Sequence, residues 1–478
     1  GFPYFFIYFS WSLMFFGMVE TVWGMRQLYG FTASGHSHYA LTGSFFNPGP
    51  YAGYLAMILP ICLYHYLRVP EKWRYLCKSL KIEKITAAVA GMLILCVLPS
   101  TMSRSAWIAA AISCIWVAYM HRDKRKWNIL WRRYKKRYIL WGTGIFLILL
   151  LAAAGMFFLK PDSALGRLFM WKMTCRAIAA HPWGCHTGFA CAYGGAQSLY
   201  FASGNYAAWE ERVAGSPEYA FNEYLQVATE YGIPFLFVVL LIIAFCLWKG
   251  SREGRIGLCG GIIAVLVFAF SSYPMQIPGF AVTFYFLLAA CVIGRSKIML
   301  LFFISIIILL GAYYWKNNQY DACKNWHRSK MLYNIGAYQS AKEEYETLYP
   351  ELKNRGAFLF EYGYCLHKLK QYDNSAIVLE EAMKHSCDPM LLNIIGKNYQ
   401  AVGKYEKAEG SLIRSTHRLP GRIYPYYLLA KLYAEPENQQ PEKLKRMVEV
   451  VLTKEPKVQS TAVKEMRAEV KKLLKQIN

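Results

Sequence analysis

The sequence predicts an all-α membrane protein: a polytopic bundle of transmembrane helices followed by a soluble α-solenoid of stacked helix pairs. Two observations lead to this prediction. The 478 residues are 55% hydrophobic yet carry a formal net charge of +24, so apolar and charged residues must be segregated along the chain. After residue 315 the composition changes sharply to charged, helix-forming residues. We therefore expect a membrane domain, residues 1–315, and a repeat domain, residues 316–478.

The membrane domain contains about nine apolar runs whose lengths approach or reach the span of a bilayer. Because a helix satisfies its own backbone hydrogen bonds in lipid, each run is expected to be a helix. The alternative, buried helices of a soluble protein, would need an implausibly large core. The first run already contains Gly1, which predicts a truncated N-terminus. The runs are residues 1–19, 51–67, 86–101, 105–120, 138–159, 233–248, 256–272, 278–294 and 298–315.

Basic loops predict the orientation, because Lys and Arg favour the cytoplasmic side of a membrane. Loop 121–137, "HRDKRKWNILWRRYKKR", holds nine basic residues, and loops 68–85, 249–255 and 295–297 are also basic. If the spans alternate, all four loops share one side. The prediction is a multi-pass protein of the bacterial inner membrane, with loop 160–231 and the repeat domain in the periplasm. This use of the positive charge argues against nucleic-acid binding.

The cysteines predict neither a disulfide framework nor a metal centre. Several of the 13 lie in apolar runs, where cysteine acts as a small apolar residue. Cys175, Cys185 and Cys191 share loop 160–231, and one disulfide among them stays open. No pair has the spacing of a zinc site. We expect no metal and no cofactor.

The repeat domain shows internal similarity in "GAYQSAKEEYETL", "KQYDNSAIVLEEA" and "GKYEKAEGSLIRS". Its period of 33 to 34 residues resembles the tetratricopeptide repeat. Three or four such helix pairs would stack into a short curved solenoid. Its concave face could bind a peptide or protein, although simple scaffolding remains open. The aligned positions are Tyr338, Tyr372 and Tyr405, with Ala341, Ala376 and Ala408.

Three arginines are candidates for binding a phosphate group. Arg104 lies in "PSTMSRSAWIAA" between two apolar runs, Arg167 lies in "GRLFMW" just after a run, and Arg26 lies in "WGMRQLYGF". A cation near the membrane is costly without a partner, and a guanidinium matches the geometry of phosphate oxygens. Each one singly could instead be an interfacial arginine that reaches to lipid headgroups.

Four segments together resemble the O-antigen ligase and polymerase superfamily over roughly residues 20–300. "TGSFFNPGPYAGYLAMILP", which contains Asn47, is similar to the Asn-Pro start of a span in that family. "SRSAW" resembles its Ser-Arg turn, and "GRLFMW", with Trp171, followed by "HPWG" resembles the start of its outer loop. "AFNEYLQVATEYGI" resembles the end of that loop, where ligases carry His-Asn. Their order and spacing make the resemblance specific.

The resemblance implies transfer of a glycan from an undecaprenyl pyrophosphate carrier to an acceptor at the periplasmic face. Arg104 and Arg167 match the family's arginines and would stabilise the leaving pyrophosphate, with Arg26, Asn47, Asn222 and Trp171 as further substrate-binding candidates. The resemblance also implies metal independence. Membrane lipid and either lipid A-core or a protein would be the partners.

One departure from the family concerns the catalytic base. Phe221 stands where ligases have histidine, and phenylalanine cannot accept a proton, although Asn222 remains. Either another side chain acts as the base or positioning alone suffices. Two of these residues could instead have ordinary structural roles. Glu223 could be an acidic residue in the first turn of a helix, and His181 could be a residue of a turn. The candidate bases are Glu218, Glu223, His181 and His186.

The choice within the superfamily rests on two opposing features. The repeat domain favours a ligase or protein O-oligosaccharyltransferase, because a polymerase has no evident need for a groove that binds a macromolecule. The missing histidine favours a repeat-unit polymerase. A membrane-anchored repeat scaffold or a flippase-like transporter is the alternative from another class.

Overall fold

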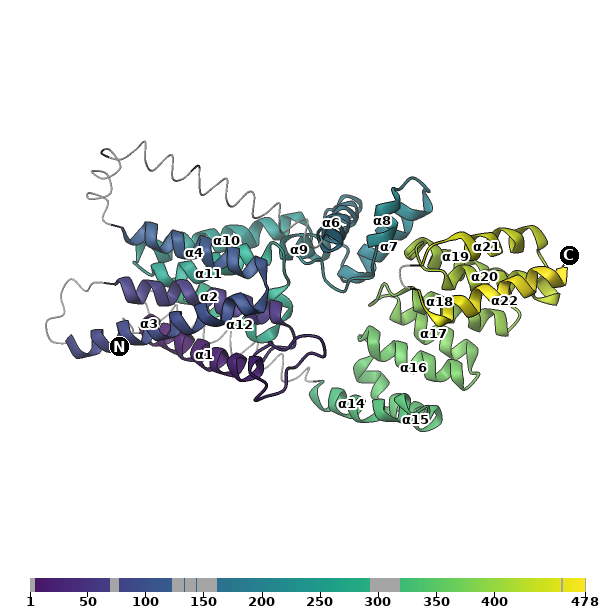
Figure 1. Ribbon diagram of the computed structural model, residues 1–478, viewed down its shortest axis with the longest axis horizontal. Coiled ribbons are helices and arrows are strands. Elements are labelled where there is room, and N and C mark those ends of the chain that lie inside the picture. The colour runs from purple at the N-terminus through teal and green to yellow at the C-terminus, as the bar shows by residue number, and fades with distance from the viewer. Residues whose placement is uncertain are drawn as a thin grey trace. The chain divides into compact units, whose positions relative to one another are not determined.

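The computed structural model describes residues 5–68, 77–122, 133, 143, 161–292, 319–456 and 459–477 (Figure 1). Within these ranges every regular element is a helix and no strand occurs, which confirms the all-α prediction for that part of the chain. The chain divides into two compact units. The first contains the membrane-domain helices and the short segment Phe221–Tyr224; the second contains the rest of the long loop and the repeat domain.

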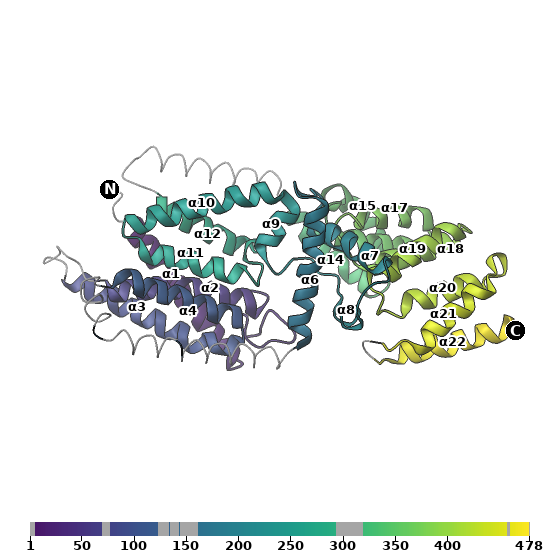
Figure 2. The same ribbon diagram turned by 90° about the horizontal axis from the view of Figure 1, so that it is seen from above.

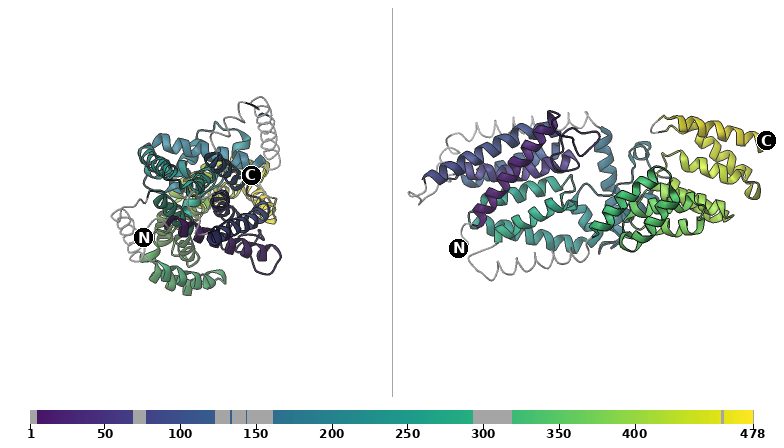
Figure 3. Two further views of the ribbon diagram at one scale, coloured as in Figure 1. Left: turned by 90° about the vertical axis from the view of Figure 1, so that its left-hand side faces the viewer. Right: turned by 90° about the horizontal axis from the view of Figure 1, so that it is seen from below.

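The first unit is a helix bundle arranged around α2. This helix packs against α1, α3, α4 and α11, and the helices of residues 5–122, purple to blue, lie against the teal helices of residues 233–292 (Figure 3, right). Asn47 caps α2, since its side-chain oxygen accepts a 2.9 Å hydrogen bond from the Gly49 amide. The helices are α1 (Phe5–Leu28), α2 (Pro48–Leu67), α3 (Cys77–Val97), α4 (Arg104–His121), α10 (Ile233–Arg252), α11 (Ile256–Ala269) and α12 (Pro278–Val292).

Seven of the nine predicted spans coincide with these helices; apart from Thr143, the runs 138–159 and 298–315 lie outside the described residues. Three helical stretches in the described part are long and apolar enough to cross a membrane: Phe6–Leu28, Lys81–Thr101 and Ile233–Arg252. Helices α11 and α12 are apolar but shorter. Most residues of α2 are buried against its neighbours, so this helix contributes much of the core of the bundle.

The long loop, residues 161–232, is mostly helical. It contains α6 (Pro161–Ala180), α7 (Phe189–Ala202), α8 (Ala208–Val213) and α9 (Glu223–Tyr231). Helix α6 packs against α7 and α8. Their shared core is rich in aromatic side chains, including the buried Phe169, Phe189, Tyr193, Tyr200 and Phe201. The same core includes the buried Cys387 and Leu419 of the repeat domain, so the loop helices and the repeat domain share it.

The repeat domain is a series of helices in which each packs against the next, from α14 to α22 (Figure 2). Each tyrosine of the sequence repeat begins a helix, namely α15, α17 and α19, and the paired alanines are buried. The helix pairs thus follow the predicted period; their classification as tetratricopeptide repeats stays a prediction. The helices are α14 (Tyr320–Asn334), α15 (Tyr338–Leu352), α16 (Gly356–Lys368), α17 (Tyr372–Ala382), α18 (Pro389–Ala401), α19 (Tyr405–Arg418), α20 (Tyr424–Ala434), α21 (Pro441–Thr453) and α22 (Thr461–Ile477).

Candidate functional site

Arg104 begins α4 directly after a tight turn. The turn contains a short 3₁₀ helix, Leu98–Thr101, and then Met102, whose backbone is left-handed with φ of 53°. The indole nitrogen of Trp107 donates a 2.9 Å hydrogen bond to the Leu98 carbonyl, which ties the first turn of α4 back to the end of α3. Arg104 is half-buried. Its charge adds to the positive end of the α4 dipole, an arrangement that favours an anion.

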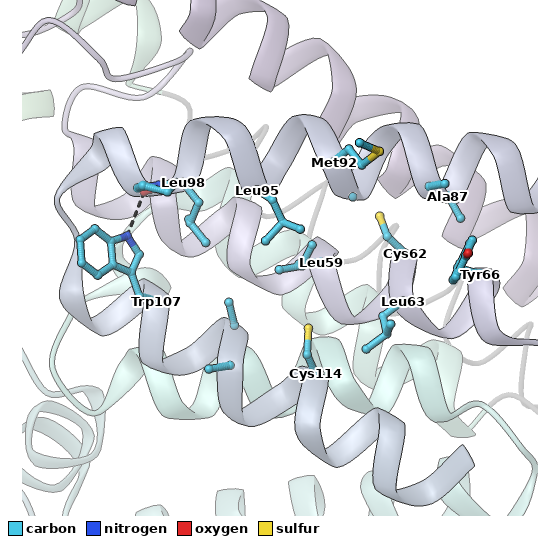
Figure 4. Close-up of a pocket in the computed structure, with 15 residues that line it drawn as sticks. Leu59, Cys62, Leu63, Tyr66, Ala87, Met92, Leu95, Leu98, Trp107 and Cys114 are labelled. Atoms are coloured by element: carbon cyan, nitrogen blue, oxygen red, sulfur yellow. Dashed lines mark hydrogen bonds between the residues drawn. The ribbon is translucent and has the colours of Figure 1, made fainter. Parts of the chain in front are cut away.

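An apolar groove of 810 Å³ runs from this turn between α2, α3 and α4 (Figure 4). Trp107 and Leu98 stand at one end of the view and Tyr66 and Ala87 at the other. The end beside Trp107 is one helical turn from Arg104. The walls are almost wholly aliphatic or sulfur-containing, with Leu59, Cys62, Leu63, Met92, Leu95 and Cys114 among them. A long hydrocarbon chain suits such a surface.

Asn222 and Glu223 are both buried, and both belong to the short segment Phe221–Tyr224 of the first unit. The Glu223 carboxylate accepts a 2.7 Å hydrogen bond from the Met275 amide and a 3.3 Å bond from the Gln276 side chain. Glu223 therefore anchors the start of α9 to the α11–α12 connection. This contact gives the proposed base a clear structural task, because both carboxylate oxygens serve as acceptors there.

Phe221, which precedes Asn222, has an unusual backbone. Its φ is 48°, in the left-handed region that costs a side-chain-bearing residue free energy. The ring stands edge-on to Tyr273, with 5.0 Å between centroids and 84° between planes. Phe221 thus contributes an aromatic contact to the α11–α12 connection.

The "HPWG" and "EYG" motifs contact each other directly. The Ile233 amide donates a 2.9 Å hydrogen bond to the Pro182 carbonyl. Gly184 and Gly232 have φ of 99° and 93°, and a Cβ on Gly184 would lie 2.7 Å from the carbonyl carbon of Tyr231. Only glycine tolerates both that conformation and that approach. The sequence did not reveal this backbone clasp, which closes the long loop on itself.

The remaining predicted residues are placed as follows. His181, His186 and Glu218 are exposed, and His186 has a left-handed backbone with φ of 53°. Arg26 is exposed in the last turn of α1, while Arg167 and Trp171 are half-buried on α6. The first unit contains Arg26, Asn47, Arg104, Asn222 and Glu223; the second contains Arg167, Trp171, His181, His186 and Glu218.

A comparison with known families bears on this arrangement. Residues 87–240 match the O-Antigen ligase family. The matched residues include the second half of α3, the Arg104 turn, the whole long loop and the start of α10. They support the O-antigen ligase superfamily and, in general terms, a membrane glycosyltransferase of that kind. The comparison with curated proteins finds no match for this chain.

Within the O-antigen ligase match, α9 carries a polar pair that the sequence reasoning missed. The Gln226 side-chain oxygen accepts a 3.1 Å bond from the Ala220 amide, and its nitrogen donates to Glu230 at 3.3 Å. Glu230 also accepts a 3.0 Å bond from the Phe189 amide. Burial raises the pKa of the Glu230 carboxyl despite these bonds. The four-residue spacing of Gln226 and Glu230 on one helix was the available signal.

A second polar cluster of the matched region lies inside the loop core. Lys172 donates to Glu210 at 2.5 Å and to the Tyr200 hydroxyl at 2.8 Å. Tyr200 donates in turn to Glu210 at 2.6 Å, and the Ala207 amide adds a 3.0 Å bond. Burial opposes ionisation of Glu210, but the hydrogen bonds from Lys172 and Tyr200 outweigh it and lower the pKa of the carboxyl.

This cluster predicts a pH-dependent stability of the loop. Because the folded pKa of Glu210 lies below its ordinary value of about 4.3, the stabilisation is present above that pH and is lost as pH falls through the folded value. Glu210→Gln should lower the free energy of unfolding at pH 7 by about 1–3 kcal/mol and flatten its dependence on pH below about pH 5. Thermal unfolding of the purified protein as a function of pH measures both effects.

The matched control for Glu210 is Asp162→Asn. Asp162 pairs with Arg212 at 3.0 Å, but both side chains are largely exposed, so its loss should cost no more than about 1 kcal/mol. Parallel pH profiles for wild type and Glu210→Gln would contradict the assigned role of the cluster.

Proposed function

We propose that this protein transfers a glycan from an undecaprenyl pyrophosphate carrier to an acceptor at the periplasmic face of a bacterial inner membrane. The observation that carries the proposal is the apolar groove of 810 Å³ that ends beside the turn bearing Arg104. A polyprenyl pyrophosphate has the same two parts, a long hydrocarbon chain and a doubly charged head. The family match over residues 87–240 supports the glycosyltransferase class.

In the proposed reaction an acceptor oxygen attacks the anomeric carbon of the glycan while its bond to the carrier pyrophosphate breaks. Negative charge then accumulates on the leaving pyrophosphate. A guanidinium at a helix N-terminus stabilises that charge, and Arg104 supplies it from α4. Arg167 is the second arginine assigned to this task, and no metal is required by the proposed step.

The acceptor proton needs a destination, and Phe221 cannot take it. We assign the buried Asn222 to orient the acceptor, because an amide both donates and accepts hydrogen bonds. Glu223 is the nearest carboxylate in sequence, and it is held at the α11–α12 connection. His181, His186 and Glu218 are the exposed alternatives. The proton passes to one of these groups or to water.

The acceptor is proposed to be a macromolecule, lipid A-core or a protein. The stacked helix pairs of the repeat domain support this choice, since such arrays offer extended surfaces to large partners. Repeat-unit polymerisation is the second candidate function. The observation that favours it is Phe221, which replaces the side chain typical of ligases.

The length of carrier-linked glycan in cells that lack the protein tests these functions. If the protein transfers finished glycan, long polymerised chains should accumulate on the carrier. Accumulation of single repeat units would instead identify a polymerase. An unchanged amount and length of carrier-linked glycan would refute both enzymes and leave the scaffold or transporter.

A further inference from the structure

The second unit contains a polar cleft of 700 Å³ outside the site described above. Its walls come from four places: the start of α6, α8 of the long loop, the turn between α19 and α20, and the turn after α21. Trp209 and Arg212 line one wall, and Gly421, Arg422 and Lys454 line two of the others.

The walls of the cleft are held together by direct contacts. Helix α7 packs against α19, and the Gln197 side chain donates a 2.5 Å hydrogen bond to the Arg418 carbonyl. Lys454 pairs with Glu211 at 2.6 Å across the cleft, with both side chains about four-fifths buried. The cleft is therefore a built feature of this unit.

The charges that line the cleft are balanced. Arg212 pairs with Asp162 at 3.0 Å, and Lys454 pairs with Glu211. An anionic ligand would be repelled by the carboxylates of the cleft, and a cationic ligand by its guanidinium and ammonium groups. The cleft therefore favours neither an anionic nor a cationic ligand. A hydroxyl can donate to a carboxylate and accept from an arginine, so a neutral ligand rich in hydroxyl groups matches this surface.

An aromatic surface completes the cleft. Trp209 is 37% exposed on α8, which leaves part of its indole open to a ligand. A sugar ring has an apolar face of C–H groups and a rim of hydroxyl groups. The face of an indole ring packs against the C–H groups. Arg422, which is exposed on another wall of the cleft, can donate up to five hydrogen bonds to the hydroxyl groups of the sugar.

We propose that this cleft binds an uncharged stretch of saccharide chain, with Trp209 stacked on a sugar ring and Arg422 bound to its hydroxyls. The proposal rests on the transfer function above, because it assigns the cleft to a saccharide of that reaction: the carrier-linked glycan or, with lipid A-core as the acceptor, its core oligosaccharide. The carrier-linked glycan and the core oligosaccharide of the acceptor share the same chemistry. The experiment therefore includes both.

The test measures binding to the detergent-solubilised full chain by thermophoresis. One probe is the oligosaccharide released by mild acid from the carrier of cells that lack the protein; the other is the core oligosaccharide released from their lipopolysaccharide. The probe that binds identifies the source. Trp209→Ala should weaken its binding about tenfold, and Trp209→Phe, which keeps a ring, should weaken it less. Arg422→Ala on the other wall should also weaken it.

Trp183→Ala is the matched control, because Trp183 is 75% exposed and does not line the cleft; its binding should equal that of wild type. Equal binding by Trp209→Ala and wild type would overturn the proposal, as would failure of wild type to bind either probe. Failure here is separate from failure of the transfer function. If the wild-type protein transfers glycan but binds neither probe, only the saccharide-binding role of the cleft is refuted. If it binds a probe but cells that lack the protein show unaltered carrier-linked glycan, only the transfer function is refuted.

Discussion

Arg104→Ala should abolish most glycan transfer while leaving the protein at normal abundance in the membrane. The expected fall in transfer rate is about 100- to 1,000-fold, the usual loss when one group that stabilises developing negative charge is removed. The physical reason is the position of Arg104 at the start of α4, one turn from the end of the apolar groove. The measurement is transferred glycan per molecule of protein in cells.

The controls for Arg104 use the same helix. Arg122 follows the last residue of α4 and its guanidinium lies over the Tyr119 ring at 3.5 Å, so Arg122→Ala removes an arginine from the opposite end and should leave transfer intact. Arg104→Lys keeps the charge but loses the two-pronged donor geometry, and should retain intermediate activity. Normal transfer by both the Arg104→Ala and the Arg167→Ala variants would refute the proposed pyrophosphate site.

Gly184→Ala should unfold or deplete the protein without touching the proposed chemistry. The new Cβ would lie 2.7 Å from the Tyr231 carbonyl carbon and 2.8 Å from the Glu230 oxygen, on a backbone with φ of 99°. Backbone atoms cannot move aside as a side-chain end can. The steric and conformational costs together are about 2–5 kcal/mol, a large part of the stability of a typical domain. Thermal unfolding and steady-state abundance report the loss.

Gly204→Ala separates the two causes. Gly204 also has positive φ, 71°, but a Cβ there meets nothing within 4 Å, so only the conformational cost of about 1–2 kcal/mol applies. If both glycine variants lose the same stability, close packing of the "HPWG" and "EYG" motifs makes no contribution.

Local pattern in the sequence was sufficient to predict much of the fold. Helices occupy seven of the nine predicted runs, and each repeat tyrosine begins a helix. Such features depend on the spacing of apolar residues within short windows, which the sequence displays. The apolar run of α2 was harder to interpret, because a helix buried among protein neighbours and one exposed to lipid have similar compositions.

The candidate site was predictable only as a set of residue types. The sequence named Asn47 as a substrate-binding candidate, and the structure shows in addition that its side chain caps α2. The sequence left Glu223 open as a base or as an acid in the first turn of a helix; the structure shows that it also anchors the α11–α12 connection. A hydrogen bond to a residue 52 positions away leaves no local pattern.

The sequence by itself determined where helices form and which segments carry arginine, glycine and aromatic chemistry, because helical periodicity and composition act over a few turns of chain. The tertiary structure alone decided which of these segments meet. It brought "HPWG" against "EYG", and it joined α8 to turns more than 200 residues further on to form the polar cleft. Contacts of this kind depend on the packing of whole helices, so they appear only when the chain has folded.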